Sequence, residues 1–374
     1  MQLQDDARVV MTLDAGGTNF VFGAIGGGDE IVEPVNLPAE GDDLDRSVAN
    51  ILEGFSQVVS TLEASLGVHP VAISFAFPGP ADYTQGVIGD LGNLPGYRGG
   101  VPLGAIIEDR FDLPVFINND GDLFAFGEAI AGFLPWLNSL MEEAGSPKRF
   151  RNLLGVTLGT GFGGGIVTDG RLHIGDNSAG GEIWCLRNRS IPNTTAEESV
   201  SIRGVQRSFA ASTGTDLAAA PSPKEIYLIG MGESDGDRDA ARSAWHDFGM
   251  ALGDALANAI TLIDAPIVIG GGVAGAHKLF LPSVIEEMNS GFTSPEGEVI
   301  PRMELQAFNI EQDEERHAFC HAASKELTVP GGDRVVPYDP LKRVGVGVTR
   351  LGTSRATAVG AYAFALSQLD SGQR

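Results

Sequence analysis

Residues 9–25, VVMTLDAGGTNFVFGAI, place a short polar tip between two apolar segments. The run 9–13 has the length and β-branched start of a buried strand, and 20–25 has the composition of a second strand. Between them lie Asp14, three residues with little or no side chain, and Thr18. Bare amides and a hydroxyl donate hydrogen bonds to phosphate oxygens, and a carboxylate holds Mg²⁺ directly or through water. The tip therefore indicates a phosphate site, with a tight glycine turn and a solvated aspartate as the alternative.

The composition limits the class of protein. The chain has 374 residues, 43% of them hydrophobic, which is enough for two domains with real cores. A net charge of −24 argues against nucleic acid and anionic membrane surfaces as partners. No apolar run reaches the roughly 18 residues of a membrane span, and the acidic N-terminus has no signal-peptide pattern. With two cysteines, Cys185 and Cys320, we expect a cytoplasmic protein without a disulfide framework.

A second glycine-tipped hairpin follows in residues 153–175, LLGVTLGTGFGGGIVTDGRLHIG. An apolar strand again enters a turn, made of Gly159, Thr160 and Gly161, and the chain again returns as a strand. Asp169-Gly170 then has the composition of a two-residue hairpin turn. The repetition predicts two halves of similar build, with a cleft between them that faces both glycine turns.

The sequence GTGFGG at 159–164 also fits the dinucleotide fingerprint G-x-G-x-x-G. That fingerprint requires a helix directly after it, with the pyrophosphate at the helix N-terminus. Here the next residues, Gly-Ile-Val-Thr at 165–168, favour a strand, so an NAD-dependent dehydrogenase is the weaker alternative. GGGVAGAHK at 270–278 lacks the Gly-Lys-Ser/Thr of a P-loop.

Residues 113–133, LPVFINNDGDLFAFGEAIAGF, predict a strand followed by a helix. The strand ends in the pair Asn119-Asp120. Either Asp120 or Asp122 occupies a position suited to a helix N-cap. The pattern alone therefore does not decide whether Asp120 caps the helix or takes part in a reaction.

Other segments complete the expected architecture. Apolar positions at helical spacing predict a helix over 44–66. Residues 265–288 predict a strand, a glycine turn and a helix, and such a turn is a good place for phosphate or a nucleoside. Residues 133–152 are interpreted as a crossover between the halves. The region 288–345 is rich in glycine and charge and shows no usable motif.

Six motifs in order resemble those of the ROK family of bacterial sugar kinases: LDAGGTNFVFGAI, FPGPAD, INNDGDLFAFGEA, VTLGTGFGGGIVTDGRL, AGGEIW and IGGGVA. Each motif alone is weak, whereas six in the right order are specific. The resemblance implies the actin-like, ribonuclease H-like α/β fold, with two domains flanking a cleft. We expect a small N-terminal domain over 1–132, a larger domain over 133–353, and a helix over about 354–370 that packs back on the first domain.

The resemblance also implies a reaction. Family kinases transfer the γ-phosphate of ATP, with Mg²⁺, to a sugar hydroxyl, usually on C6, and we expect glucose or a related hexose as the substrate. An N-acetylhexosamine or fructose kinase of the same family and a non-catalytic sugar-sensing member are the alternatives. The family further implies a cytoplasmic homodimer that binds a small sugar and neither nucleic acid nor membrane.

The family motifs assign roles to residues of this chain. They imply that Asp120 is the general base, which leaves Asp122 as the helix cap. The implied sugar contacts are Asn119, Glu182, Glu198 and Asn93, with Glu197 as an alternative to its neighbour. The implied nucleotide contacts are Asp14 (near Mg²⁺), Gly16, Gly17, Thr18, Thr160, Gly161, Gly271 and Gly272.

One departure from the family pattern concerns zinc. Many members follow Gly-Glu-Ile-Gly with a histidine and a cysteine-rich zinc motif. Here Trp184 and Cys185 replace that glycine and histidine, and the loop that follows contains no cysteine. A structural zinc needs four good ligands. We therefore expect no zinc site, interpret Cys185 as a small packed thiol, and leave the identity of the sugar open.

Overall fold

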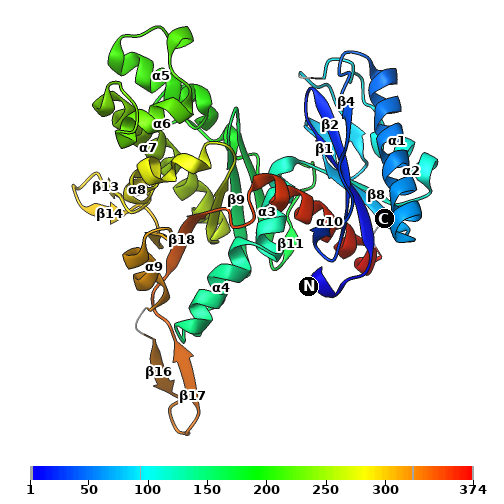
Figure 1. Cartoon of the computed structure of the whole chain (residues 1–374). Coiled ribbons are helices and arrows are strands. Elements are labelled where there is room, and N and C mark those ends of the chain that lie inside the picture. The colour runs from blue at the N-terminus through cyan, green and yellow to red at the C-terminus, as the bar shows by residue number, and fades with distance from the viewer. Residues whose placement is uncertain (1–2, 93, 322–323, 373–374) are drawn as a thin grey trace. The chain divides into compact units, whose positions relative to one another are not determined.

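The computed structural model describes residues 3–92, 94–321 and 324–372. These residues form two compact α/β units, coloured along the chain in Figure 1. Unit 1 comprises the described residues of Met1–Gly132, Arg171–Gly180 and Leu351–Arg374, and unit 2 comprises those of Phe133–Gly170 and Gly181–Arg350.

Unit 1 is built on a sheet with the strand order β3-β2-β1-β5-β8, in which β4 also pairs with β2. The pair β1–β2 is antiparallel, whereas β5 and β8 continue the sheet in parallel. The strands are β1 Val9–Ala15, β2 Asn19–Gly26, β3 Asp29–Glu30, β4 Val35–Pro38, β5 Pro70–Ala76, β6 Ala81–Asp82, β7 Val87–Ile88, β8 Val115–Asn118 and β11 Arg171–Leu172. The helices are α1 Leu44–Thr61, α2 Leu103–Phe111, α3 Asp120–Ile130 and α10 Thr353–Ser371.

Unit 2 repeats this arrangement with the strand order β10-β9-β12-β18-β15. The pair β9–β10 is antiparallel, and β12, β18 and β15 follow in parallel. The strands are β9 Leu153–Leu158, β10 Phe162–Thr168, β12 Ile267–Gly270, β13 Gly291–Thr293, β14 Val299–Pro301, β15 Gln306–Asn309, β16 Lys325–Thr328, β17 Val335–Tyr338 and β18 Arg343–Val348. The helices are α4 Phe133–Glu143, α5 Ile202–Thr213, α6 Pro223–Met231, α7 Arg238–Ile263, α8 His277–Met288 and α9 Asp313–Cys320.

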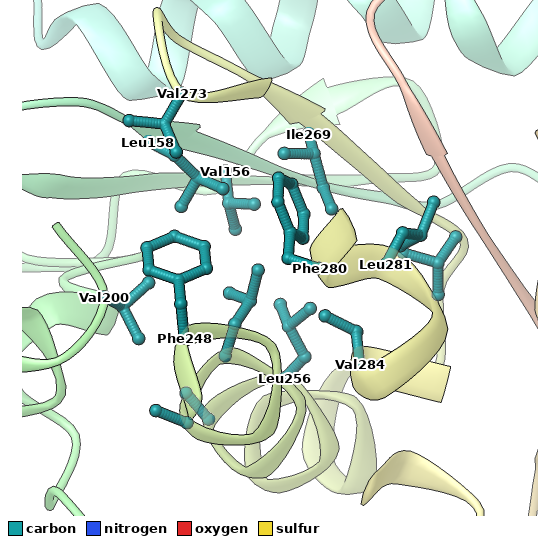
Figure 2. Close-up of a cluster of buried hydrophobic side chains, with 14 of the residues drawn as sticks. Val156, Leu158, Val200, Phe248, Leu256, Ile269, Val273, Phe280, Leu281 and Val284 are labelled. Carbon is teal, nitrogen blue, oxygen red and sulfur yellow. The ribbon is translucent and has the colours of Figure 1, made fainter. Parts of the chain in front are cut away.

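Each unit has its own hydrophobic core. In unit 1, aromatic rings fill the space beside the sheet; Phe22 and Phe55, for example, meet edge to face with ring centres 5.1 Å apart. In unit 2, Figure 2 shows apolar side chains of the sheet packing against α7 and α8. The figure labels residues of the strands, of both helices and of the loops between them: Val156, Leu158, Val200, Phe248, Leu256, Ile269, Val273, Phe280, Leu281 and Val284.

The structure contains regular elements that the sequence pattern did not indicate. Residues 133–143, interpreted as part of a crossover, form helix α4. Within the region without a motif, β15 and β18 are buried strands of the second sheet. In β18, with the sequence RVGVGV, glycine alternates with valine, so the apolar signal of a buried strand is diluted.

One stretch of the described residues, Asp120–Glu143, has the length and mean hydropathy of a membrane span. Of its most apolar window, 61% is buried inside the protein. Burial of this kind is typical of helices that form part of a protein core.

Helices α3 and α10 of unit 1 pack with their backbones in close contact. A Cβ atom on Gly127 would lie 1.9 Å from the carbonyl oxygen of Ala356, and one on Gly360 would lie 1.9 Å from that of Leu123. No side chain fits at either position, so two glycines, one on each helix, set the distance between the helices. The first residue of α3 is Asp120, so this crossing also fixes where the predicted base lies.

Replacement of the glycine on α10 tests this crossing. We expect Gly360→Ala to destabilise the protein by at least about 2 kcal/mol, because the added methyl overlaps a backbone atom that cannot move without shifting the helix. Gly275→Ala is the control, since a Cβ there meets no atom within 4 Å. Urea unfolding followed by circular dichroism measures both, and equal midpoints for the two variants would contradict the proposed constraint.

Candidate functional site

The tip of the first hairpin presents backbone and hydroxyl groups. Strand β1 ends at Ala15 and β2 begins at Asn19, which leaves Gly16, Gly17 and Thr18 in the turn. Gly17 and Thr18 are exposed, and a Cβ on Gly17 would meet no atom within 4 Å. The carbonyl of Thr18 accepts a hydrogen bond of 2.9 Å from the Ala39 amide, which holds the turn against the end of β4. The turn is therefore fixed, and its outer face is open to a ligand.

The Asn119-Asp120 pair lies where β8 ends and α3 begins. Asn119 is the N-cap, and its side-chain oxygen accepts a 2.9 Å hydrogen bond from the Asp122 amide. The prediction that Asp122 caps this helix is therefore wrong: Asp122 lies inside α3 and is only 3% exposed. Asp120 is exposed in the first turn, and one of its carboxylate oxygens accepts a 2.9 Å hydrogen bond from the Gly121 amide.

Asp14, at the end of β1, shares an electrostatic environment with Asp120. Partial burial and then the charge of Asp120 raise the pKa of Asp14 above its ordinary value. The sheet thus brings two predicted site carboxylates together at one edge of unit 1. No group of three or more His, Cys, Asp or Glu side chains suited to a metal occurs among the residues that the structure describes.

The tip of the second hairpin is braced by its neighbours in unit 2. The Gly159 amide donates to the Gly161 carbonyl at 3.0 Å, and the Ile202 amide donates to the Gly159 carbonyl at 2.9 Å. Glu197 accepts a 3.1 Å hydrogen bond from the Phe162 amide. Thr160 is exposed at the tip. The turn is thus held from two sides, with a hydroxyl presented outward.

The predicted adenosine turn packs directly on the strand that leads to this second tip. Gly271 has φ +85°, and a Cβ there would lie 2.2 Å from the Leu158 carbonyl oxygen, so only glycine fits. That carbonyl accepts a 3.0 Å hydrogen bond from the Val273 amide. A Cβ on Gly272, by contrast, would meet no atom within 4 Å. Unit 2 therefore joins its two predicted nucleotide turns into one rigid surface.

Two acids of unit 2 flank the thiol of Cys185. Partial burial raises the pKa of Cys185, and the charges of Glu182 and Glu197 add to the shift. The indole N–H of Trp184 donates a hydrogen bond to Glu182. Cys185 is exposed rather than packed, so the interpretation of it as a packed thiol is wrong. Its exposure follows from its place in a surface loop, a feature that hydrophobicity alone does not reveal.

Glu197 and Glu198 share Arg203, which lies 3.7 Å from Glu197 and 3.3 Å from Glu198, but they differ in their other contacts. Glu198 forms ion pairs with Arg207 at 2.8 Å and Arg203 at 3.3 Å. The Arg207 hydrogen bond is the main cause of its lowered pKa. Glu197 instead lies beside the Gly161 turn and near Cys185. Glu197, the alternative that the sequence left open, is therefore the acid that contacts the tip of the second hairpin. The predicted contact Asn93 lies outside the described residues.

Comparison with known proteins places this geometry in a family. The ROK family model matches residues 10–307. The chain belongs to the ROK family. A crystal structure of glucokinase from Parabacteroides distasonis is 52% identical, covers 98% of this chain and 99% of that chain, and has a TM-score of 0.90. The predicted actin-like fold and the sugar kinase class are therefore confirmed.

Two further similar proteins are a curated relative and a solved structure. N-acetyl-D-glucosamine kinase from Vibrio cholerae is 32% identical over 174 residues, which are 46% of this chain and 51% of that protein, so the match spans about half its length. A ROK family glucokinase from Streptomyces griseus was solved in complex with glucose and AMPPNP. It is 17% identical, covers 95% of this chain and 98% of that chain, and has a TM-score of 0.59, which shows the shared fold.

The raised pKa of Asp14 predicts a trade between stability and function in this ROK protein. A carboxyl whose pKa is higher in the folded than in the unfolded state destabilises the fold above the folded pKa, and the penalty fades as the pH falls toward the unfolded value. We therefore expect Asp14→Asn to raise the Tm at pH 7. The gain should shrink in acid, as thermal unfolding across pH would record. A lower Tm at pH 7 would contradict the expectation that the charged Asp14 destabilises the fold.

Proposed function

We propose that this chain is a glucokinase that transfers the γ-phosphate of ATP to the C6 hydroxyl of glucose. The observation that carries the proposal is the exposed Asp120 at the start of α3, beside Asp14 at the end of β1. The near full-length identity of 52% with a glucokinase supports glucose as the sugar. Use of ATP supports a cytoplasmic location.

In the proposed mechanism, Asp120 accepts the proton of the attacking sugar hydroxyl and orients that hydroxyl toward the γ-phosphate. Asp120 is exposed, and the hydrogen bond that it accepts from the Gly121 amide uses one carboxylate oxygen, which leaves the other for this role. General base catalysis of this kind contributes about 10²–10⁴-fold. The rest of the acceleration in phosphoryl transfer comes from positioning and from neutralising charge.

The proposed sugar contacts follow from which atoms are already engaged. Asn119 uses its side-chain oxygen to cap α3, so its amide nitrogen is the group that donates to a sugar oxygen. Glu182 and Glu197 accept hydrogen bonds from sugar hydroxyls. A buried polar group left without its partner costs about 1–3 kcal/mol, which gives such contacts their selectivity. Asn93 is a further proposed sugar contact.

The proposed nucleotide contacts are backbone amides and hydroxyls. Gly16, Gly17 and Thr18 in unit 1 and Thr160 and Gly161 in unit 2 would bind the phosphates. Gly271 and Gly272 would lie against the adenosine. Asp14 is the residue that would hold Mg²⁺, and its repulsion by Asp120 fits a position for a cation. When bound with the nucleotide, Mg²⁺ would supply neutralisation of the phosphate charge.

An N-acetylhexosamine is the second candidate substrate, supported by the Vibrio cholerae relative. The alternatives are separated by measuring ADP release with ATP and Mg²⁺ and each of several sugars: glucose, mannose, fructose and the N-acetylated hexosamines. The proposal expects the highest kcat/KM with glucose. A preference for an N-acetylated sugar would favour the second candidate. Sugar binding without ADP release would indicate a sensor.

Replacement of the proposed base tests the mechanism. We expect Asp120→Asn to lower kcat by at least about 100-fold, because the amide cannot accept the proton. Glucose binding measured by calorimetry should largely survive. Asp109→Asn, at an exposed acid of α2, is the control and should keep its activity. A turnover within tenfold of the unmodified enzyme would remove Asp120 from the role of base.

Paired substitutions test which of the two neighbouring acids contacts the sugar. We expect Glu197→Gln to raise the KM for glucose by about tenfold or more, since a hydrogen bond to a charged group is worth about 1.5–3 kcal/mol. Glu198→Gln should change KM less, because Glu198 is engaged by Arg207 and Arg203. Steady-state kinetics with saturating ATP measures both, and the reverse order would assign the contact to Glu198.

A further inference from the structure

The two proposed sugar-binding acids of unit 2, Glu182 and Glu197, lie on two short 3₁₀ turns that one loop joins. The turns are Ile183–Cys185 and Ala196–Glu198. Glu182 directly precedes the first turn, and Glu197 lies within the second. The Ala196 amide donates to the Leu186 carbonyl at 2.7 Å, which ties the start of the second turn to the end of the first. The position of one acid relative to the other therefore depends on how the loop 186–196 is held.

The side chain of Asn188 holds this loop together from within, and the residue is only 4% exposed. Its amide nitrogen donates to the Thr195 carbonyl at 3.0 Å and to the Ser199 hydroxyl at 2.9 Å. Its side-chain oxygen accepts from the Ser190 amide at 2.9 Å and from the Ile191 amide at 3.0 Å. An asparagine amide has two N–H donors and one oxygen with two lone pairs. Every hydrogen bond that this side chain can make is therefore made inside the loop.

Backbone contacts surround this side chain and depend on the same closure. The Asn188 amide donates to the Thr194 carbonyl at 3.0 Å, and Arg187 forms an antiparallel bridge with Thr195. The Thr194 hydroxyl donates to the Ile191 carbonyl at 2.8 Å. A fully bonded polar group in a buried position makes its surroundings rigid. Removal of the Asn188 side chain would leave the two amides that it accepts from without their acceptor and would loosen the loop.

The loop offers a metal ion no suitable ligands. Residues 186–201 contain neither cysteine nor histidine, the usual ligands of structural zinc. The groups that meet the side-chain oxygen of Asn188 are backbone N–H donors, which repel a cation. Hydrogen bonds of Asn188 therefore hold this loop in a chain that lacks the cysteine-rich zinc motif of many family members.

The loop is also attached to helix α8, directly beside Asn188. Arg189 forms an ion pair and a hydrogen bond with Glu287 of that helix, and the Glu287 side chain is only 3% exposed. A buried carboxylate that loses a cationic partner is costly, so this pair stabilises the contact between the loop and the helix. Asn188 and Arg189 together thus connect the two turns with the helices of unit 2.

We propose that Asn188 is a positioning residue for sugar binding, whose four side-chain hydrogen bonds hold Glu182 and Glu197 in the arrangement that sugar hydroxyls require. All the hydrogen-bonding groups of its side chain are used inside the loop, so Asn188 acts through the two acids and does not contact the sugar. The inference rests on the proposed sugar contacts and extends them to the residue that holds them in place.

Asn188→Ala tests this role in steady-state kinetics with saturating ATP. We expect the KM for glucose to rise about tenfold or more and kcat to stay within about threefold, because the displaced acids lose contacts that are made equally before and during the reaction. A residue with only a structural role would behave differently. Its loss would lower the Tm and the active fraction, and with it the apparent kcat, without changing the KM for glucose.

Asn289→Ala is the matched control in the same unit. The Asn289 side chain donates to the Ala307 carbonyl at 2.9 Å and accepts from the Ala307 amide at 2.8 Å, so its loss should lower the Tm but leave the KM for glucose unchanged. Ser199→Ala removes one of the four bonds of Asn188 and should raise this KM about threefold. A KM within about twofold of the unmodified value in Asn188→Ala, or in Ser199→Ala where Asn188→Ala does not fold, overturns the proposal. An equal rise in Asn289→Ala does the same.

Two measurements do not depend on the proposed reaction. Amides of 186–201 should exchange hydrogen at least about tenfold faster in Asn188→Ala, and measurably faster in Ser199→Ala, than in the unmodified chain, with no change in β9 and β12. Excess EDTA should leave the Tm of the unmodified chain unchanged. Exchange that neither substitution accelerates, or a Tm that EDTA lowers, overturns the proposal. An unmodified chain that releases no ADP with glucose would overturn the proposed function, and the exchange experiment would still decide whether Asn188 holds the loop.

Discussion

The close contact of α3 with α10 is the constraint on which unit 1 depends. Two glycines, Gly127 and Gly360, allow the helix backbones to touch. The contact sets the position of α3 relative to the sheet, since α10 also packs on β1 and β5. Asp120 begins α3, and Asp14 ends β1. The sheet brings the two carboxylates to one edge, and the helix crossing holds α3, and with it Asp120, against that sheet.

The ionised carboxylate of Asp14 lowers the stability of the folded state. Partial burial of Asp14, and secondarily the charge of Asp120, disfavour its ionised form and so oppose folding, as the raised pKa of Asp14 indicates. The packing of α3 and the capping of that helix by Asn119 offset this cost. The predicted nucleotide turns of unit 2 differ, because their backbone is held by hydrogen bonds to Leu158 and Glu197. The predicted site residues of unit 1 thus include two neighbouring carboxylates, whereas the predicted nucleotide turns of unit 2 rest on braced backbone.

Sequence alone identified both hairpins, because a glycine-rich tip between apolar strands is a strong local signal. It did not identify the cap of α3, since Asn119, Asp120 and Asp122 are all good capping residues and only the backbone path selects among them. Glu197 and Glu198 are likewise equivalent in sequence. Arg207 of α5, which pairs with Glu198, and the Phe162 amide, which donates to Glu197, distinguish them. Strand β18 was missed because its burial depends on strands distant in the chain.

Helix α10 also determines the order in which the chain completes its structure. It is synthesised after all of unit 2, yet its Tyr362 hydroxyl donates to the Arg8 carbonyl at 3.1 Å and accepts from the Gly27 amide at 3.2 Å. Unit 1, although it leaves the ribosome first, has an open core until these late residues emerge. We therefore expect the nascent chain to complete unit 2 before unit 1, the reverse of the usual order in which N-terminal domains fold first.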